Sequence, residues 1–226
     1  MCASPRKSVN LAMAVTDIHQ MTLSGDMACL DFVNSGLETD RIKVERLHHY
    51  DDLLILAERL KLLTPEELLN LREMTAGDLD LASKYLKKAL NLREALYQIL
   101  NAVANSRPSE IDEKYLSIFN TWRGEALTAQ VFTVSDNSLQ LGFPTHGELL
   151  IRPLWLFVLS ANELLEKGNL EYLRRCAGCD WLFYDRSKSH RRKWCDMQTC
   201  GSSVKAKRYY QRKKAGVASN SQQKIV

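Results

Sequence analysis

Four of the six cysteines lie in the last quarter of the chain, in two closely spaced pairs. Two residues separate Cys176 from Cys179, four separate Cys195 from Cys200, and fifteen lie between the pairs. Such spacings let both sulfurs of a pair turn toward one ion, and two pairs complete a tetrahedron. Because four protein ligands leave no open coordination position, the pattern predicts one structural Zn²⁺ ion.

Other interpretations of these cysteines are weaker. Unliganded core thiols would not be expected as spaced pairs inside a polar, basic segment. Four cysteines could also hold an iron–sulfur cluster, although two short ligand loops favour zinc. His190 lies in the spacer and could replace one sulfur. Cys2 and Cys29 have no cysteine nearby and are interpreted as a terminal residue and a small core residue.

Cationic residues crowd around the cysteine pairs. Their charges would neutralise phosphates and release counterions, which predicts a salt-sensitive nucleic-acid interface. A helix expected from about Val204 to Lys214, capped by Ser202 or Ser203, fits the width of the DNA major groove. The candidate contacts are Arg186, Lys188, Arg191, Arg192 and Lys193 in the spacer, and Lys205, Lys207, Arg208 and Arg212 after the last cysteine.

Charge is divided unequally along the chain. Residues 1–173 carry 17 Lys and Arg against 24 Asp and Glu, a net charge of −7, whereas residues 174–226 carry 14 against 3, a net charge of +11. Only the basic end is therefore expected to approach a polyanion. No apolar run nears the roughly 20 residues that a membrane span needs, and no export signal is recognised, so a cytoplasmic location is expected.

The elements that must position the cysteines are predicted to be mostly helical. Apolar residues recur at helical spacing in several windows, and Thr64-Pro65-Glu66-Glu67 is a capping box that starts one helix. The segment at residues 25–35 could be a strand or a buried helix. The expected elements are helices at 53–60, from 65, 78–105, 109–123 and 149–167, and a β-hairpin near 129–143 around Asp136-Asn137.

These elements predict a mainly α fold with a small β-hairpin, of the α+β class. A helical N-terminal domain is followed by a small C-terminal zinc module, treble-clef-like or ribbon-like, that ends in a basic helix. The predicted bounds are a flexible N-terminus at 1–17, the helical domain at 18–172, the zinc module at 173–214 and a disordered tail at 215–226.

Particular residues of both parts resemble a known family. The chain is similar to bacterial proteins that combine an N-terminal ABATE domain, the domain of stress-induced transcription regulators, with a C-terminal CGNR zinc finger. This resemblance implies a DNA-binding transcription regulator whose body senses a ligand or partner. In the zinc finger the residues that carry it are Arg175-Cys176, Cys179, Trp181-Leu182-Phe183, Asp185, Ser187, Arg192, Trp194-Cys195, Met197, Cys200-Gly201, Lys205 to Tyr210 and Arg212. In the body the matching residues are Cys29 to Ser35, Leu92-Arg93, Leu96-Tyr97, Leu154-Trp155 and Ser160-Ala161.

The chain departs from this family at its signature. Where the family has Cys-Gly-Asn-Arg, this sequence reads Cys200-Gly201-Ser202-Ser203. The fourth zinc ligand is retained, whereas any phosphate or base contact of the family arginine is left open.

The favoured function is a zinc-dependent regulator that binds duplex DNA and responds to a small-molecule effector. Asp31, Asn34 and Trp155 are candidate effector contacts, because a carboxylate and an amide near apolar walls could orient a ligand. Structural roles are the stronger interpretation of these residues, with Asp31 or Asn34 as a turn or cap residue and Trp155 in the core. A homodimer is also considered, because one short module offers few DNA contacts.

Two other functions remain open. An RNA-binding protein would use the same cations together with stacking aromatic side chains. A protein-interaction adaptor would use zinc only to shape the fold. An enzyme is not expected, because the five histidines show no metal or triad spacing and no glycine-rich phosphate loop is present. The aromatic residues that would stack on bases in the RNA-binding hypothesis are Trp181, Phe183, Tyr184, Tyr209 and Tyr210.

Overall fold

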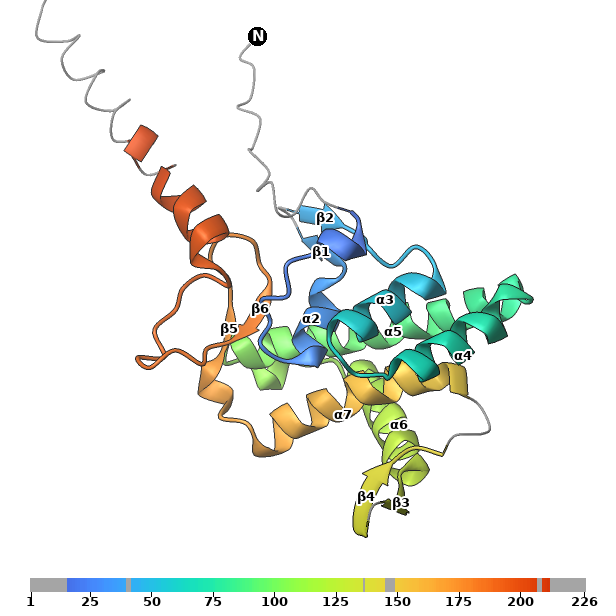
Figure 1. Ribbon diagram of the computed structural model, residues 1–226. Helices are drawn as coiled ribbons and strands as arrows, with labels where there is room; N and C mark the ends of the chain where they lie inside the picture. Colours follow the sequence, from blue (N-terminus) through green and yellow to red (C-terminus); the bar gives the residue numbers. More distant parts are fainter. Residues whose placement is uncertain (1–15, 40–41, 136, 145–148, 207–208, 212–226) are drawn as a thin grey trace, which may run out of the picture.

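The computed structural model describes residues 16–39, 42–135, 137–144, 149–206 and 209–211 (Figure 1). These residues are mostly helical with small antiparallel hairpins, which confirms the predicted α+β class. The expected tail at 215–226 and nearly all of the expected N-terminal segment lie outside the described residues. Within the described part of the chain, no helix combines the length and hydropathy that crossing a membrane requires.

The helices of the body, residues 16–172, follow the apolar periodicity of the sequence. The segment at residues 25–35, which could have been a strand, contains a buried helix. The helices are α2 (Ala28–Asn34), α3 (Tyr50–Arg59), α4 (Pro65–Ala76), α5 (Leu79–Ala104), α6 (Glu113–Ala129) and α7 (Arg152–Lys167), with 3₁₀ turns at Ile18–Gln20, Pro108–Glu110, Leu149–Ile151 and Leu170–Tyr172.

Side-chain caps set several helix starts. The Thr64 hydroxyl accepts a hydrogen bond from the Glu67 amide at 3.3 Å, and the Glu67 carboxylate accepts one from the Thr64 amide at 2.7 Å. This reciprocal pair is the capping box that the sequence predicted. The predicted start at residue 109 was wrong, because Asp112 caps α6 by accepting from the Lys114 amide. Residues 108–110 form a separate turn.

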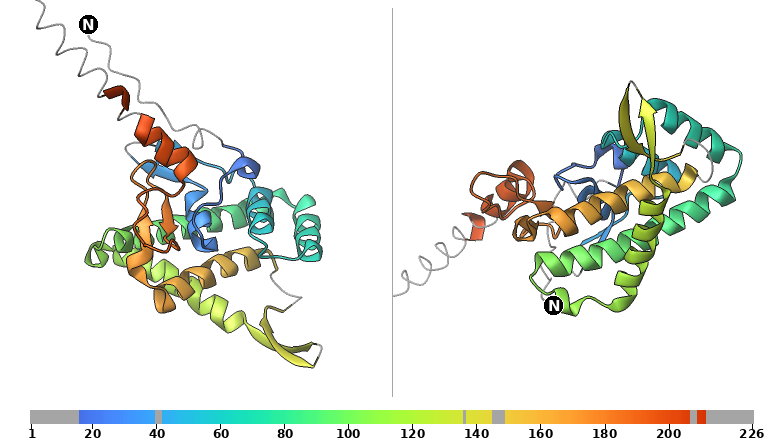
Figure 2. Two further views of the ribbon diagram at one scale, coloured as in Figure 1. Left: turned by 60° about the vertical axis from the view of Figure 1, so that its left-hand side comes forward. Right: turned by 90° about the horizontal axis from the view of Figure 1, so that it is seen from below.

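Helix α5 runs through the middle of the molecule and contacts both ends of the fold (Figures 1 and 2). It packs on α6, α3 and α2 in the body and on the strands that follow residue 172. Helices α2 and α7 meet through stacked rings of Phe32 and Phe157, whose centroids are 4.3 Å apart. The buried side chains form one cluster that extends from the body into the cysteine-rich segment.

The described residues contain three two-stranded antiparallel sheets, where the sequence predicted one. The predicted hairpin is β3 (Val131–Ser135) with β4 (Ser138–Gly142), and it starts later than expected because α6 continues to Ala129. The other two are β1 (Leu37–Thr39) with β2 (Ile42–Val44), and β5 (Leu173–Arg175) with β6 (Leu182–Tyr184). Strands of three residues are too short to show periodicity.

Candidate metal centre and nucleic-acid interface

The first cysteine pair lies in the turn between β5 and β6. The amide of Cys176 donates to the Trp181 carbonyl at 2.8 Å, and the Asp180 amide donates to the Cys176 carbonyl at 3.1 Å. Asp180 has a left-handed backbone with φ of 65°, and its buried carboxylate pairs with the Arg175 guanidinium at 3.0 Å. The tight turn therefore places Cys176 and Cys179 on the same side of the hairpin.

All four predicted sulfurs come together, and all four cysteines are buried. The four Sγ atoms lie within 4.8 Å of one another, with 3.5 Å between Cys179 and Cys195 and 3.7 Å between Cys195 and Cys200. A tetrahedral site with Zn–S bonds of 2.3 Å requires sulfur separations of about 3.8 Å. The cluster therefore fits one structural Zn²⁺ ion held by four thiolates.

Such close sulfurs cannot all ionise without a cation among them. Hydrogen bonding with Cys179 lowers the pKa of the Cys176 thiol, and the same interaction raises the pKa of the Cys179 thiol. A bound dication removes this conflict, because zinc coordination deprotonates every ligand. By contrast, burial raises the pKa of the isolated Cys29 thiol to about 12, in keeping with a core residue.

The residues around the sulfurs are packed closely. A Cβ atom at Gly178 would lie 3.3 Å from the Cys200 Cβ, and one at Gly201 would lie 3.2 Å from the Met197 sulfur. Their role is therefore close approach, since neither has a positive φ. His190 is not part of the sulfur cluster: its Nδ1 atom bonds to the Asp185 carbonyl at 2.7 Å and its ring stacks on Tyr172.

The helix after the last cysteine starts earlier than the sequence suggested. It begins with a wide helical turn at Met197–Gly201, and Asp196 caps it by accepting from the Thr199 amide at 2.7 Å. Ser202 already has helical dihedrals, and its hydroxyl donates to the Met197 carbonyl at 3.2 Å. The prediction that Ser202 or Ser203 caps this helix was wrong, because both lie inside it.

A buried carboxylate shapes the basic loop, which we define as residues 185–194. The Asp185 Oδ1 atom accepts from the Ser187 amide at 3.0 Å and Oδ2 accepts from the Arg192 amide at 2.8 Å. Burial opposes ionisation of Asp185, but these hydrogen bonds outweigh it and lower the pKa of its carboxyl group. Asp185 therefore fixes the backbone that carries most of the predicted cations.

The predicted cations fall into three groups. Five are exposed to solvent, whereas Arg192 is 27% exposed at its side chain and is held by protein contacts. The guanidinium of Arg192 lies 3.2 Å from the Asp26 carboxylate, donates to the Cys195 carbonyl and stacks on Phe183. The exposed cations are Arg186, Lys188, Arg191, Lys193 and Lys205, while Lys207, Arg208 and Arg212 lie outside the described residues.

The predicted stacking aromatics are mostly unavailable. Trp181 and Phe183 are 3% and 0% exposed and belong to the core, so their assignment as surface stacking residues was wrong. Trp181, Leu182 and Phe183 are buried in succession, because β6 packs between β5 and α2. Tyr184 is half-buried between Tyr172 and Arg186. Tyr209 and Tyr210 are exposed, at 64% and 65%.

The zinc module, residues 173–206 of the described chain, is attached to α2 by paired polar contacts. The buried Asn34 side chain donates to the Leu182 carbonyl at 2.8 Å and accepts from the Leu182 amide at 2.9 Å. The Tyr184 amide donates to the Gly25 carbonyl at 2.9 Å. The body therefore extends the outer edge of β6 with strand-like hydrogen bonds, and sequence reasoning missed this role of Asn34.

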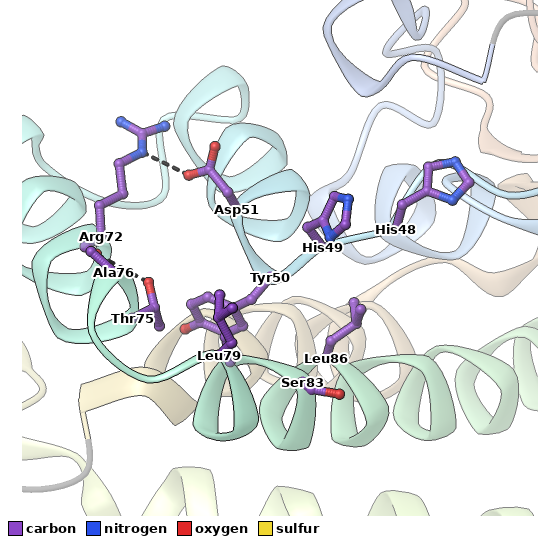
Figure 3. Close-up of a pocket in the computed structure, with 11 residues that line it drawn as sticks. His48, His49, Tyr50, Asp51, Arg72, Thr75, Ala76, Leu79, Ser83 and Leu86 are labelled. Atoms are coloured by element: carbon purple, nitrogen blue, oxygen red, sulfur yellow. Dashed lines mark hydrogen bonds and ion pairs between the residues drawn. The ribbon is translucent and has the colours of Figure 1, made fainter.

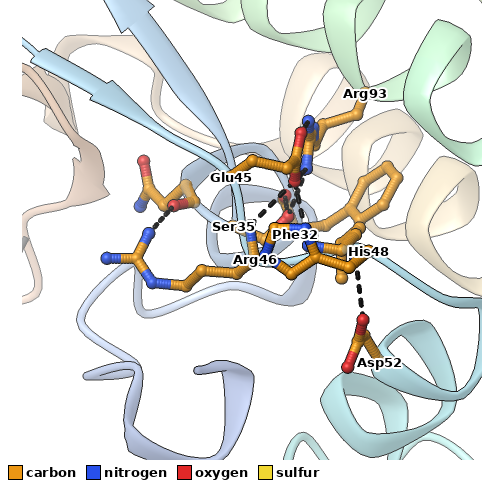
Figure 4. A network of polar contacts seen from close by, with 9 residues as sticks. Phe32, Ser35, Glu45, Arg46, His48, Asp52 and Arg93 are labelled. Atoms are coloured by element: carbon orange, nitrogen blue, oxygen red, sulfur yellow. Dashed lines mark hydrogen bonds and ion pairs between the residues drawn. The ribbon is translucent and has the colours of Figure 1, made fainter. Parts of the chain in front are cut away.

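Arg46 forms a second connection, and the chain around it is anchored by an ion pair (Figure 4). Its fully buried guanidinium lies 5.4 Å from the Trp181 ring centroid and donates to the Asn34 carbonyl at 3.4 Å. Burial lowers the pKa of Arg46 to about 10. The adjacent Glu45 accepts two hydrogen bonds from Arg93, and this bidentate pair fixes the backbone from which Arg46 extends.

The three candidate effector contacts have separate partners within the protein, and none of them lines the groove beside α3. Asp31 is buried and accepts from the Gly25 amide at 2.9 Å, and Asn34 uses both side-chain groups on Leu182. The ring of Trp155 stacks on Phe143 at 5.2 Å.

This groove of about 650 Å³ lies between the start of α3, the end of α4 and the start of α5 (Figure 3). Its exposed lining is mainly apolar, and His48, His49, Asp51, Arg72, Thr75 and Ser83 add polar groups around it. The lining residues are His48, His49, Tyr50, Asp51, Arg72, Thr75, Ala76, Leu79, Ala82, Ser83 and Leu86.

Comparison with known families agrees with this architecture. The ABATE model, described as "Putative stress-induced transcription regulator", matches residues 26–168, and the CGNR zinc finger model matches residues 172–213. None of the curated proteins matches the chain. Because the first match covers more than half of the sequence and the second coincides with the four-sulfur cluster, the chain belongs to the ABATE family and carries a CGNR zinc finger.

Proposed function

We propose that this protein regulates transcription by binding duplex DNA through the exposed cations of its zinc module, and that its body is the effector-sensing part. The observation that carries the proposal is the geometry of the basic loop. Lys188, Arg191 and Lys193 are exposed on a loop whose backbone is fixed by Asp185 and by the zinc cluster. Cations on a rigid frame lose less conformational entropy when they meet phosphates.

DNA is favoured over RNA by the burial of the aromatic side chains. Sequence-tolerant recognition of single strands uses aromatic faces on which bases stack. Trp181 and Phe183 are enclosed in the core, so the exposed aromatic residues that the structure describes at this end of the chain are Tyr209 and Tyr210, which follow the zinc module. Backbone contacts from Lys and Arg suit a duplex without needing stacked bases.

The effector part of the proposal concerns the groove beside α3. Its volume lies in the range of small-molecule pockets, and its apolar lining with two histidines suits an amphipathic ligand. His48 follows Arg46 by two residues, and Arg46 packs against Trp181 of the zinc module. A ligand that displaces the chain at His48 would therefore move Arg46 and change the attachment of β6 to the body. Coupling requires such a difference, because an effector must bind one conformation of the protein more tightly than the other.

DNA binding is tested by salt dependence. The double variant Lys188→Ala/Arg191→Ala is compared with Lys84→Ala/Lys87→Ala, a pair of exposed lysines on α5. Fluorescence anisotropy of labelled duplex is recorded with zinc-loaded protein over a range of salt concentrations. Each lost phosphate contact lowers the slope of log K against log salt by about 0.9, so the first variant should lose roughly 2 and the control nothing.

The same assay separates the alternatives. Stronger binding of single-stranded RNA than of duplex DNA would favour the hypothesis of an RNA-binding protein. Absence of salt-dependent affinity for any nucleic acid would favour an adaptor. Equal slopes for the two double variants would show that the basic loop does not contact phosphate.

Coupling is tested by filling the groove. Leu86→Trp places a large side chain in the groove, and Leu69→Trp makes the same change at an exposed position of α4. We expect at least about a fivefold change in DNA affinity for Leu86→Trp and little for Leu69→Trp. An Arg46→Met background should remove the effect. No response to Leu86→Trp would refute coupling while leaving DNA binding intact.

A further inference from the structure

The β3–β4 hairpin has one face made of large apolar side chains. Antiparallel register pairs Phe132 with Leu141 and Val134 with Leu139. Because side chains alternate along a strand, these four residues lie on the same face, while Thr133 and Gln140 lie on the other. The hairpin therefore has one apolar face and one polar face, as does a sheet that packs against a hydrophobic core.

This apolar face is open to solvent. Phe132, Val134 and Leu139 are 70%, 77% and 72% exposed, and Leu141 is 53% exposed. The strands contact mainly each other. The hairpin projects from the body away from the zinc module in every view (Figures 1 and 2). At its base, Phe143 is buried against Trp155.

An unsupported two-stranded sheet with an exposed apolar face is marginally stable in water. The four side chains present roughly 500 Å² of apolar surface, near the upper end of what a monomer exposes. Such a patch indicates a surface that another macromolecule covers.

We propose that this face is the contact between two copies of the chain, related by a twofold axis. Among residues 131–142 the sequence contains a single charged residue, Asp136, so the face offers nothing to a charged partner and does not repel its own copy. Apposing two such faces removes roughly 1,000 Å² from solvent, about the smallest area expected of a biological interface and typical of a reversible one. The pairing also gives each hairpin a second layer.

The dimer has a consequence for recognition that rests on the proposed function. Because the hairpin and the zinc module lie on separate parts of the molecule, a hairpin-mediated dimer leaves both basic loops free. Two modules related by a twofold axis would read two half-sites in inverted orientation. Dimerisation itself does not depend on DNA binding.

The experiment uses the full, zinc-loaded chain in sedimentation velocity and light scattering at micromolar concentrations. The wild type should have twice the chain mass of 25.8 kDa. Leu139→Lys places a charge on the apolar face of both copies and should raise the dissociation constant roughly thirtyfold or more. Gln140→Lys makes the same charge change on the opposite face and should remain dimeric. Zinc content and circular dichroism establish that both variants are folded.

Two results would overturn the proposal. One is a wild type that stays monomeric, and flotation of that monomer with phosphatidylcholine vesicles would assign the face to lipid. The other is a dimer that Leu139→Lys leaves intact, because the interface would then lie elsewhere. A monomeric Leu139→Lys that still binds single half-sites with the wild-type salt slope would support the dimer interface and show that each zinc module binds DNA on its own.

Discussion

The attachment of the zinc module to the body leads to a quantitative prediction for Asn34→Ala. Asn34 supplies both hydrogen bonds that the outer edge of β6 makes at Leu182, at 2.8 and 2.9 Å, and it is fully buried. Alanine removes both partners and leaves the Leu182 amide and carbonyl without them. The β6 edge should therefore become the weakest part of the interface.

The magnitude follows from the cost of orphaned polar groups. A buried donor or acceptor without a partner costs about 1–3 kcal/mol, and two are created here. Some relaxation with water entry is expected, so we expect the free energy of unfolding to fall by about 3 kcal/mol. That is a large part of the 5–15 kcal/mol typical of folded domains.

Urea unfolding of the zinc-loaded protein measures this change, and hydrogen exchange locates it. The Leu182 amide should exchange faster in Asn34→Ala by about two orders of magnitude, the equivalent of about 3 kcal/mol. Asn70→Ala on the exposed face of α4 is the matched control and should change stability by less than about 0.5 kcal/mol. Asn34→Asp should be at least as damaging as alanine, because it keeps one acceptor but buries a charge.

A loss below about 1 kcal/mol in Asn34→Ala, with unchanged exchange at Leu182, would refute this reasoning. The two hydrogen bonds would then be incidental to a docking that apolar contacts already secure. If Asn34→Ala lost its zinc while the body kept its free energy of unfolding, the prediction would also be contradicted, because the zinc module and the body would then unfold independently.

Three further predictions concern the metal, the basic loop and a buried acid. Cys176→Ser should lower the zinc content below one ion per chain, measured by mass spectrometry under native conditions, because it removes one of the four thiolate ligands. Arg192→Ala should lower stability by about 1–2 kcal/mol as well as DNA affinity, whereas Arg191→Ala should lower affinity alone; equal unfolding midpoints for the two would contradict this. Burial raises the pKa of Asp31 from 3.8 to about 7, so the folded protein retains a proton that the unfolded chain releases. Stability from this group is full below pH 4 and is lost as the pH rises to 7, so wild type should lose about 2 kcal/mol relative to Asp31→Asn between pH 5 and 7 in urea titrations.

Features that depend on neighbouring residues were predictable from the sequence. Residues close together in the sequence define the capping box at Thr64, the long helix α5 and the four zinc ligands. Ligand spacing and cap chemistry are local constraints, so one sequence suffices to find them.

Features that depend on distant residues were not predictable. Asn34 and Leu182 are 148 residues apart, and the type of neither residue indicates which residue it contacts. Arg192 was predicted as a DNA contact from its charge alone, and its carboxylate partner, Asp26, could not be predicted because it lies 166 residues away. The start of the last helix was missed because aspartate and serine are comparable N-caps, so cap chemistry alone does not distinguish Asp196 from Ser202.

The core that the body and the zinc finger share limits how the zinc fingers of such proteins can be exchanged. The family matches end at residue 168 and resume at residue 172, which suggests a convenient place to exchange one finger for another. Yet Leu182 completes its hydrogen bonds on Asn34, and Trp181 is covered by Arg46. A chimera joined at this boundary would therefore fold stably only if its body kept matching residues in α2 and after β2.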